Sequence, residues 1–105
     1  MDPHTVARRR KHLQVLDVRE DVEWAAGHIE GAVHIALGAL SARQGELDRD
    51  QPVVTVCRAG SRAGKAARAL TDAGWSVEVM DGGMQGWQRA GLPLSTPDGH
   101  PGTVA

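Results

Sequence analysis

Cysteine is almost absent from this 105-residue sequence, because Cys57 is the only one. A single cysteine cannot form an internal disulfide, and the chain has no CxxC pair of the kind that binds zinc. The five histidines include no i, i+4 pair of the type found in helical zinc sites. We therefore expect neither a metal site nor a cofactor.

Aromatic residues and excess charge are also scarce. The chain has three tryptophans, no phenylalanine and no tyrosine, so it lacks the aromatic platform on which bases stack. The net charge of -1 is far from the basic excess of most nucleic-acid-binding proteins. No apolar run approaches the ~20 residues of a membrane span, and the first residues do not resemble a secretion signal. These absences predict a cytoplasmic protein that binds neither nucleic acid nor membrane.

Apolar patterning predicts alternating strands and helices. The expected strands are 13–18, 32–35, 53–56 and 76–80, and the expected helices are 3–11, 21–26, 37–47 (with a break at Gly45), 61–73 and 84–90. This alternation predicts an α/β fold with a small, mostly parallel central sheet and helices on both faces. One domain is expected over residues 1–94. Residues 95–105 lack apolar periodicity, so we expect them to form a loose C-terminal tail.

The segment between the most apolar strand and the clearest helix carries the strongest chemical signal. It consists of Cys57, Arg58, Ala59, Gly60, Ser61 and Arg62, and we call it the active loop. Small residues allow successive backbone N–H groups to turn inward and bind an anion, and the helix start adds unpaired donors and its positive dipole end. Such surroundings stabilise a thiolate, so we expect Cys57 to ionise more readily than a free cysteine and to act as a nucleophile.

Four ordered blocks make the chain resemble the single-domain rhodanese-like sulfurtransferases. They are Leu16-Asp17-Val18-Arg19-Glu20, Gly27-His28-Ile29-Glu30-Gly31-Ala32, the active loop, and Asp81-Gly82-Gly83 with Gly86-Trp87. The resemblance covers residues 13–93. Members of that family usually have a short edge strand before the first helix, and Met1-Asp2 leaves no room for it.

The resemblance implies a rhodanese-like fold and a thiosulfate sulfurtransferase that carries sulfur as a Cys57 persulfide. Its implied partners are a small anionic sulfur donor, such as thiosulfate or a persulfide, and a thiol or protein acceptor. In the active loop, Arg58 at the rim should attract the donor, while Arg62 should close the loop or be held by a carboxylate such as Asp17.

Three further residues near the loop are expected to support it. Asp17 and Arg19 lie at a strand end, where a structural ion pair is favoured over a chemical role. His28 is favoured as a hydrogen-bonded structural residue over a general base.

Two other functions remain open. Tyrosine-phosphatase-type loops, including those of rhodanese-like phosphatases, place five residues between cysteine and arginine, whereas Cys57 and Arg62 are separated by four. The shorter loop suits sulfur better than a tetrahedral oxyanion, but a rhodanese-type arsenate reductase or phosphatase is an alternative. The second open function is a non-catalytic interaction module. It is disfavoured because the chain keeps the cysteine and a complete active loop.

Overall fold

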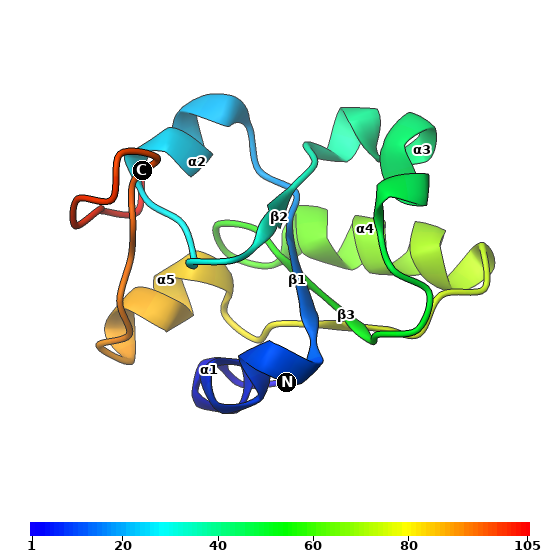
Figure 1. Ribbon diagram of the computed structural model, residues 1–105, viewed down its shortest axis with the longest axis horizontal. Coiled ribbons are helices and arrows are strands. Elements are labelled where there is room, and N and C mark those ends of the chain that lie inside the picture. The colour runs from blue at the N-terminus through cyan, green and yellow to red at the C-terminus, as the bar shows by residue number, and fades with distance from the viewer.

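A four-stranded parallel sheet forms the centre of the computed structural model, which describes residues 1–105 (Figure 1). Its strands are β1 (Gln14–Asp17), β2 (Val33–His34), β3 (Val53–Val56) and β4 (Val77–Val79), in the order β2-β1-β3-β4. Every neighbouring pair is parallel. All four residues of β3 are buried, as the continuous apolarity of this strand predicts. The α/β class is confirmed.

Helices surround this sheet. They are α1 (Pro3–Arg9), α2 (Asp21–Ala26), α3 (Leu40–Arg43), α4 (Ser61–Asp72) and α5 (Gly83–Arg89), with short 3₁₀ turns η1 (Arg10–His12), η2 (Leu37–Ala39) and η3 (Gln44–Glu46). The expected helix over 37–47 is therefore divided into three short pieces. Gly38 and Gly45 lie in this region, and glycine weakens a helix by about 1 kcal/mol relative to alanine.

Two separate apolar clusters hold the helices on the two faces of the sheet. One cluster contains Leu40 of α3 together with Ala66 and Leu70 of α4. The other contains Val6 of α1 and Trp87 of α5. The expectation of helices on both faces is therefore confirmed. Helix α2 has no buried residue and contributes none to either cluster. It lies near the carboxyl ends of the strands (Figure 1).

Met1, which lies before α1, contacts β4 through its backbone. The Met1 nitrogen donates to the Val79 carbonyl at 3.0 Å, and the Met1 carbonyl accepts from the Asp81 N–H at 2.8 Å. The first bond engages the last residue of β4, which is an edge strand of the sheet, and the second engages a residue just beyond it.

The tail over residues 95–105 differs from the loose segment that we expected. Ser95 exchanges two backbone hydrogen bonds with His28, both 2.9 Å, and the Thr103 N–H donates to the Ala26 carbonyl at 2.8 Å. Gly102 approaches Gly27 so closely that a Cβ on Gly102 would lie 2.6 Å from the Gly27 Cα. Apolar periodicity could not indicate this path, because it depends on backbone groups and two glycines. The boundary at residue 94 remains a prediction.

None of these helices is both long and apolar enough to cross a membrane.

Candidate active site

The carboxyl ends of the strands bring the predicted site residues to one edge of the sheet. Cys57 follows β3 directly, and the active loop leads into α4. Asp17 ends β1, the neighbour of β3, and Val56 pairs with it in register. The active loop, Asp17 and Arg19 therefore meet at the edge where ligands bind in parallel α/β sheets.

The amino end of α5 holds the backbone of the active loop. The Met84 N–H donates to the Cys57 carbonyl at 2.7 Å, and the Gln85 N–H donates to the Arg58 carbonyl at 3.0 Å. Gly83 has a φ of 59°, and a Cβ there would lie 2.5 Å from the Cys57 carbonyl oxygen. Only glycine allows this approach, because it has no Cβ and readily adopts a positive φ.

The thiol of Cys57 is buried and receives two backbone N–H groups. The Gly60 N–H donates to Sγ at 3.0 Å, and the Ala63 N–H, in the first turn of α4, donates at 3.3 Å. Gly60 reaches this position with a φ of 127°, which disfavours other residues. Two donors aimed at one sulfur, next to the amino end of a twelve-residue helix, form the anion-stabilising arrangement expected from the sequence.

Arg62 is held by Glu23 of α2, not by Asp17. Its Nη1 lies 2.5 Å from Glu23 Oε1, and its Nη2 lies 2.9 Å from Oε2. These hydrogen bonds lower the pKa of Glu23 from 4.5 to about 2. They also raise the pKa of Arg62, with smaller contributions from the nearby Cys57 and Glu20. The suggestion that Asp17 braces Arg62 is therefore corrected.

Asp17 is unavailable to Arg62 because Arg19 occupies it. The two side chains are fully buried, and Arg19 Nη2 lies 2.7 Å from Asp17 Oδ2 while Nε lies 2.9 Å from Oδ1. Arg19 Nη2 also donates to the Gly27 carbonyl at 2.8 Å, which ties β1 to the end of α2. This geometry fits the structural ion pair that we predicted.

The other arginine of the loop, Arg58, is exposed and has no carboxylate side chain as a partner. Its Nε donates to the Ala105 carbonyl oxygen at 2.9 Å, so the tail reaches the rim of the active loop. Ala59 is also exposed, and Ser61 begins α4. The rim position predicted for Arg58 agrees with this placement.

His28 packs against the aromatic ring of Trp24. The two rings are parallel, with centroids 3.6 Å apart, and His28 Nδ1 lies 3.0 Å from the Trp24 carbonyl oxygen. The His28 backbone also pairs with Ser95 of the tail. These contacts fit the structural role that we favoured, and no contact joins the ring to Cys57.

Glu23 is a charged residue beside the loop that the sequence did not indicate as part of the site. It was visible only as part of a capping pattern, in which Glu20 precedes α2 and Glu23 follows three residues later. Both reciprocal bonds of that capping box are present. The same carboxylate also bridges 39 positions to Arg62, a contact that no local pattern reveals.

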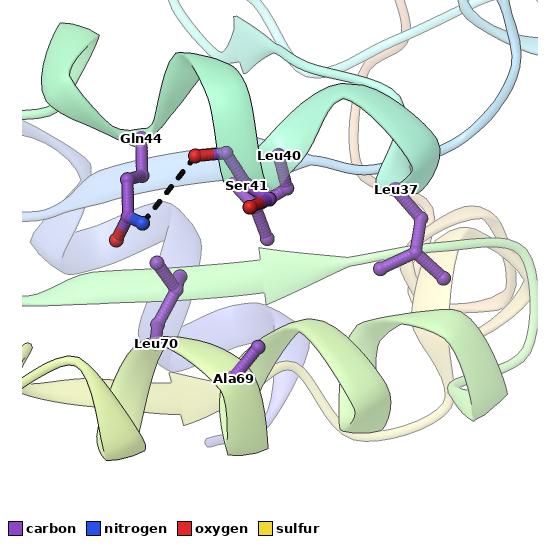
Figure 2. Close-up of a pocket in the computed structure, with 6 residues that line it drawn as sticks. All are labelled: Leu37, Leu40, Ser41, Gln44, Ala69 and Leu70. Carbon is purple, nitrogen blue, oxygen red and sulfur yellow. Dashed lines mark hydrogen bonds between the residues drawn. The ribbon is translucent and has the colours of Figure 1, made fainter.

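A shallow apolar cavity of about 230 Å³ lies apart from the active loop (Figure 2). It runs between α4 and the segment that contains η2 and α3, and it is lined by Leu37, Leu40, Ser41, Gln44, Ala69 and Leu70. No residue of the active loop lines it.

Known proteins are similar to this chain in sequence. The chain is 40% identical over 99 residues to the HTH-type transcriptional regulator Rv0324 of Mycobacterium tuberculosis, covering 89% of this chain but only 44% of that protein. It is 35% identical over 86 residues to the thiosulfate sulfurtransferase GlpE of Actinobacillus succinogenes, covering 81% and 78% of the two chains.

A solved structure and a sequence family give the same result. The crystal structure of a rhodanese-related protein from Thermoplasma volcanium matches with a TM-score of 0.86 and 29% identity, over 90% of this chain and 94% of the other. The sequence pattern of the rhodanese-like domain matches residues 2–90. On this evidence the chain belongs to the rhodanese-like domain family.

Proposed function

We propose that this protein is a sulfurtransferase in which Cys57 carries the transferred sulfur as a persulfide. The observation that carries the proposal is the pair of backbone N–H groups, from Gly60 and Ala63, that point at Cys57 Sγ. Donors in this position stabilise negative charge on sulfur both before and after the transfer. The relative that is named a thiosulfate sulfurtransferase supports the same reaction class.

The first half-reaction loads the cysteine. The Cys57 thiolate attacks the outer sulfur of thiosulfate, a new S–S bond forms, and the S–S bond of the donor breaks as sulfite leaves with its electron pair. Arg58, which is exposed at the rim, attracts the anionic donor. No metal or cofactor is required, because the reaction exchanges one S–S bond for another.

The second half-reaction removes the sulfur from the Cys57 persulfide. A thiophilic acceptor attacks the outer sulfur of the persulfide, and Cys57 leaves as the thiolate. Cyanide serves as the acceptor in an assay and forms thiocyanate, whereas a thiol or an acceptor protein is proposed in the cell. The cysteine thus returns to its starting state.

Intact mass spectrometry after treatment with thiosulfate tests the proposal directly. The wild-type protein should gain one sulfur atom and lose it on addition of cyanide, whereas Cys57→Ser should fold normally and gain none. Cys57 is the only cysteine, so no other thiol can contribute to the signal. Substantial thiosulfate:cyanide activity in the serine variant would show that the mechanism is wrong.

Hydrolysis of an aryl phosphate, together with an arsenate reduction assay, tests the alternative enzymes. Arg62 is already bound by a carboxylate through both of its terminal nitrogens, so it is poorly placed to bind a tetrahedral oxyanion. We expect no useful turnover in either assay. Robust turnover that Cys57→Ser abolishes would move the assignment to a phosphatase or arsenate reductase.

A further inference from the structure

Arg62 lies beside the thiol, but its charge is already balanced. Glu23 accepts hydrogen bonds from both of its terminal nitrogens, and the two side chains are only 31% and 15% exposed. Partial burial reduces the screening of such a pair by solvent. An anion that enters the active loop therefore meets a neutral ion pair instead of a free guanidinium.

The other charges at this edge do not restore a positive site. Arg19 is fully buried and balanced by Asp17. Glu20 is close enough to contribute to the raised pKa of Arg62, so it adds negative charge on the same side. Arg58 is the single arginine at this edge without a carboxylate side chain as partner, and it lies at the exposed rim.

We propose that Glu23 is a specificity residue, which by neutralising Arg62 makes the site favour sulfur donors with one negative charge over dianionic donors. This inference rests on the proposed sulfurtransferase function and deepens it. The neutral pair provides no net attraction that could offset the cost of desolvating a second negative charge on the donor. A dianion such as thiosulfate is therefore handicapped relative to a monoanion of similar size.

Methanethiosulfonate provides the matched monoanionic probe. It is thiosulfate with one anionic oxygen replaced by a methyl group, and it carries the same transferable outer sulfur. The Cys57 thiolate attacks that sulfur, the S–S bond of the donor breaks, and methanesulfinate leaves with the electron pair. The charge at the start, -2 in total, is conserved in the persulfide and the sulfinate.

Glu23→Gln separates a charge effect from a loss of loop geometry. Glutamine has nearly the same shape as glutamate and can still accept a hydrogen bond from Arg62, but it carries no charge. Glu46→Gln is the control, because Glu46 forms a similar two-point pair with Arg43, at 2.8 and 3.0 Å. That pair joins α3 to η3, and η3 precedes Asp48, the partner of Gln14 at the amino end of β1.

We expect Glu23→Gln to raise kcat/KM for thiosulfate by at least about fivefold relative to kcat/KM for methanethiosulfonate, since one charge interaction at a partly exposed site is worth about that factor. The change in this ratio should shrink at high salt, because screening weakens it. Glu46→Gln should leave the ratio unchanged. An unchanged ratio in Glu23→Gln, or an equal loss with both donors, would overturn the proposal.

Alkylation of Cys57 gives a second readout that does not depend on sulfur transfer. Iodoacetate is an anion, iodoacetamide is its neutral analogue, and the protein has no other thiol that could react. Glu23→Gln should increase the rate with iodoacetate relative to iodoacetamide, and an unchanged ratio of rates would contradict the role of Glu23. If the wild type transfers sulfur from neither donor, the proposed function is wrong, and the alkylation ratio still decides the role of Glu23.

Discussion

Two arginine–carboxylate pairs lie at the same edge of the sheet and differ in nearly every physical respect. Asp17 and Arg19 are two positions apart and fully buried. Glu23 and Arg62 are 39 positions apart and partly exposed, and they join α2 to the first turn of α4. The first pair is part of the packed interior, whereas the second lies where solvent and substrate can reach it.

Burial decides which of the two pairs can influence chemistry. A buried pair has lost its hydration, so removal of one partner leaves an uncompensated charge that the fold tolerates poorly. A partly exposed pair can be altered at a smaller cost in stability. The Asp17–Arg19 pair therefore determines whether the edge is formed, and the Glu23–Arg62 pair is suited to set the charge that a donor meets.

The largest expected effect follows from breaking the buried pair. Asp17→Asn should lower the free energy of unfolding by about 3–5 kcal/mol, because Arg19 would keep its charge without a counterion. Urea unfolding followed by circular dichroism measures this loss. The exposed Arg43–Glu46 pair is the matched control, and Glu46→Gln should cost less than about 1 kcal/mol. If both variants lost a similarly small amount of unfolding free energy, the buried pair would be no more important for stability than the exposed one.

The second prediction concerns acid stability and the Glu23–Arg62 pair. The pKa of Glu23 is about 2 in the folded protein and 4.5 in its reference state, so the folded state favours the ionised form. The stabilisation is complete above pH 4.5 and disappears as the pH falls toward 2. At neutral pH the free energy of unfolding of the wild type should exceed that of Glu23→Gln by about 1–2 kcal/mol. Solvent screening of the partly exposed pair keeps this difference below the full value of the pKa shift.

Unfolding free energies of the two proteins at several pH values between 2 and 7 provide the measurement. The difference in unfolding free energy between the wild type and Glu23→Gln should be constant from pH 5 to 7 and should decrease only at lower pH. An advantage that stays constant down to pH 2 would mean that the carboxylate charge of Glu23 contributes nothing.

A third contact at this edge involves no carboxylate side chain, since the tail binds through its backbone. Deletion of residues 95–105 removes the hydrogen bonds to Ala26, His28 and Arg58. We expect the melting temperature to fall by roughly 4–8 °C, the shift that about 1 kcal/mol produces in a domain of this size. An unchanged melting temperature would support the loose tail that the sequence predicts.

The smallest effect on stability is expected for Arg58, whose one hydrogen-bond partner is the main-chain oxygen of Ala105. Arg58→Ala should leave the melting temperature within about 1 °C, because surface substitutions of this kind change stability little. It should raise KM for thiosulfate about fivefold at low salt, and less at high salt, because an exposed charge is screened. Steady-state kinetics at two ionic strengths measures this, and an unchanged KM at low salt would remove Arg58 from donor binding.

Much of the active site could be predicted because its signals are local. The run from Cys57 to Arg62 directly precedes a well-patterned helix, so the cysteine, the small residues and the amino end of α4 had to be adjacent. The strand order could not be read in the same way, but alternation of strands and helices was sufficient for a parallel sheet. Where local pattern and packing agree, as in β3 and α4, the expected and observed ranges differ by at most one residue.

The α/β class and the position of the thiol follow from the sequence alone, because they depend on the order of elements along the chain and on residues a few positions apart. The pairing of Arg62 with Glu23 instead of Asp17, and the return of the tail to Ala26 and Arg58, arise only in the folded chain. Both outcomes depend on which backbone and charged groups meet in space. A guanidinium can bind any carboxylate within reach, and the folded chain decides which one that is.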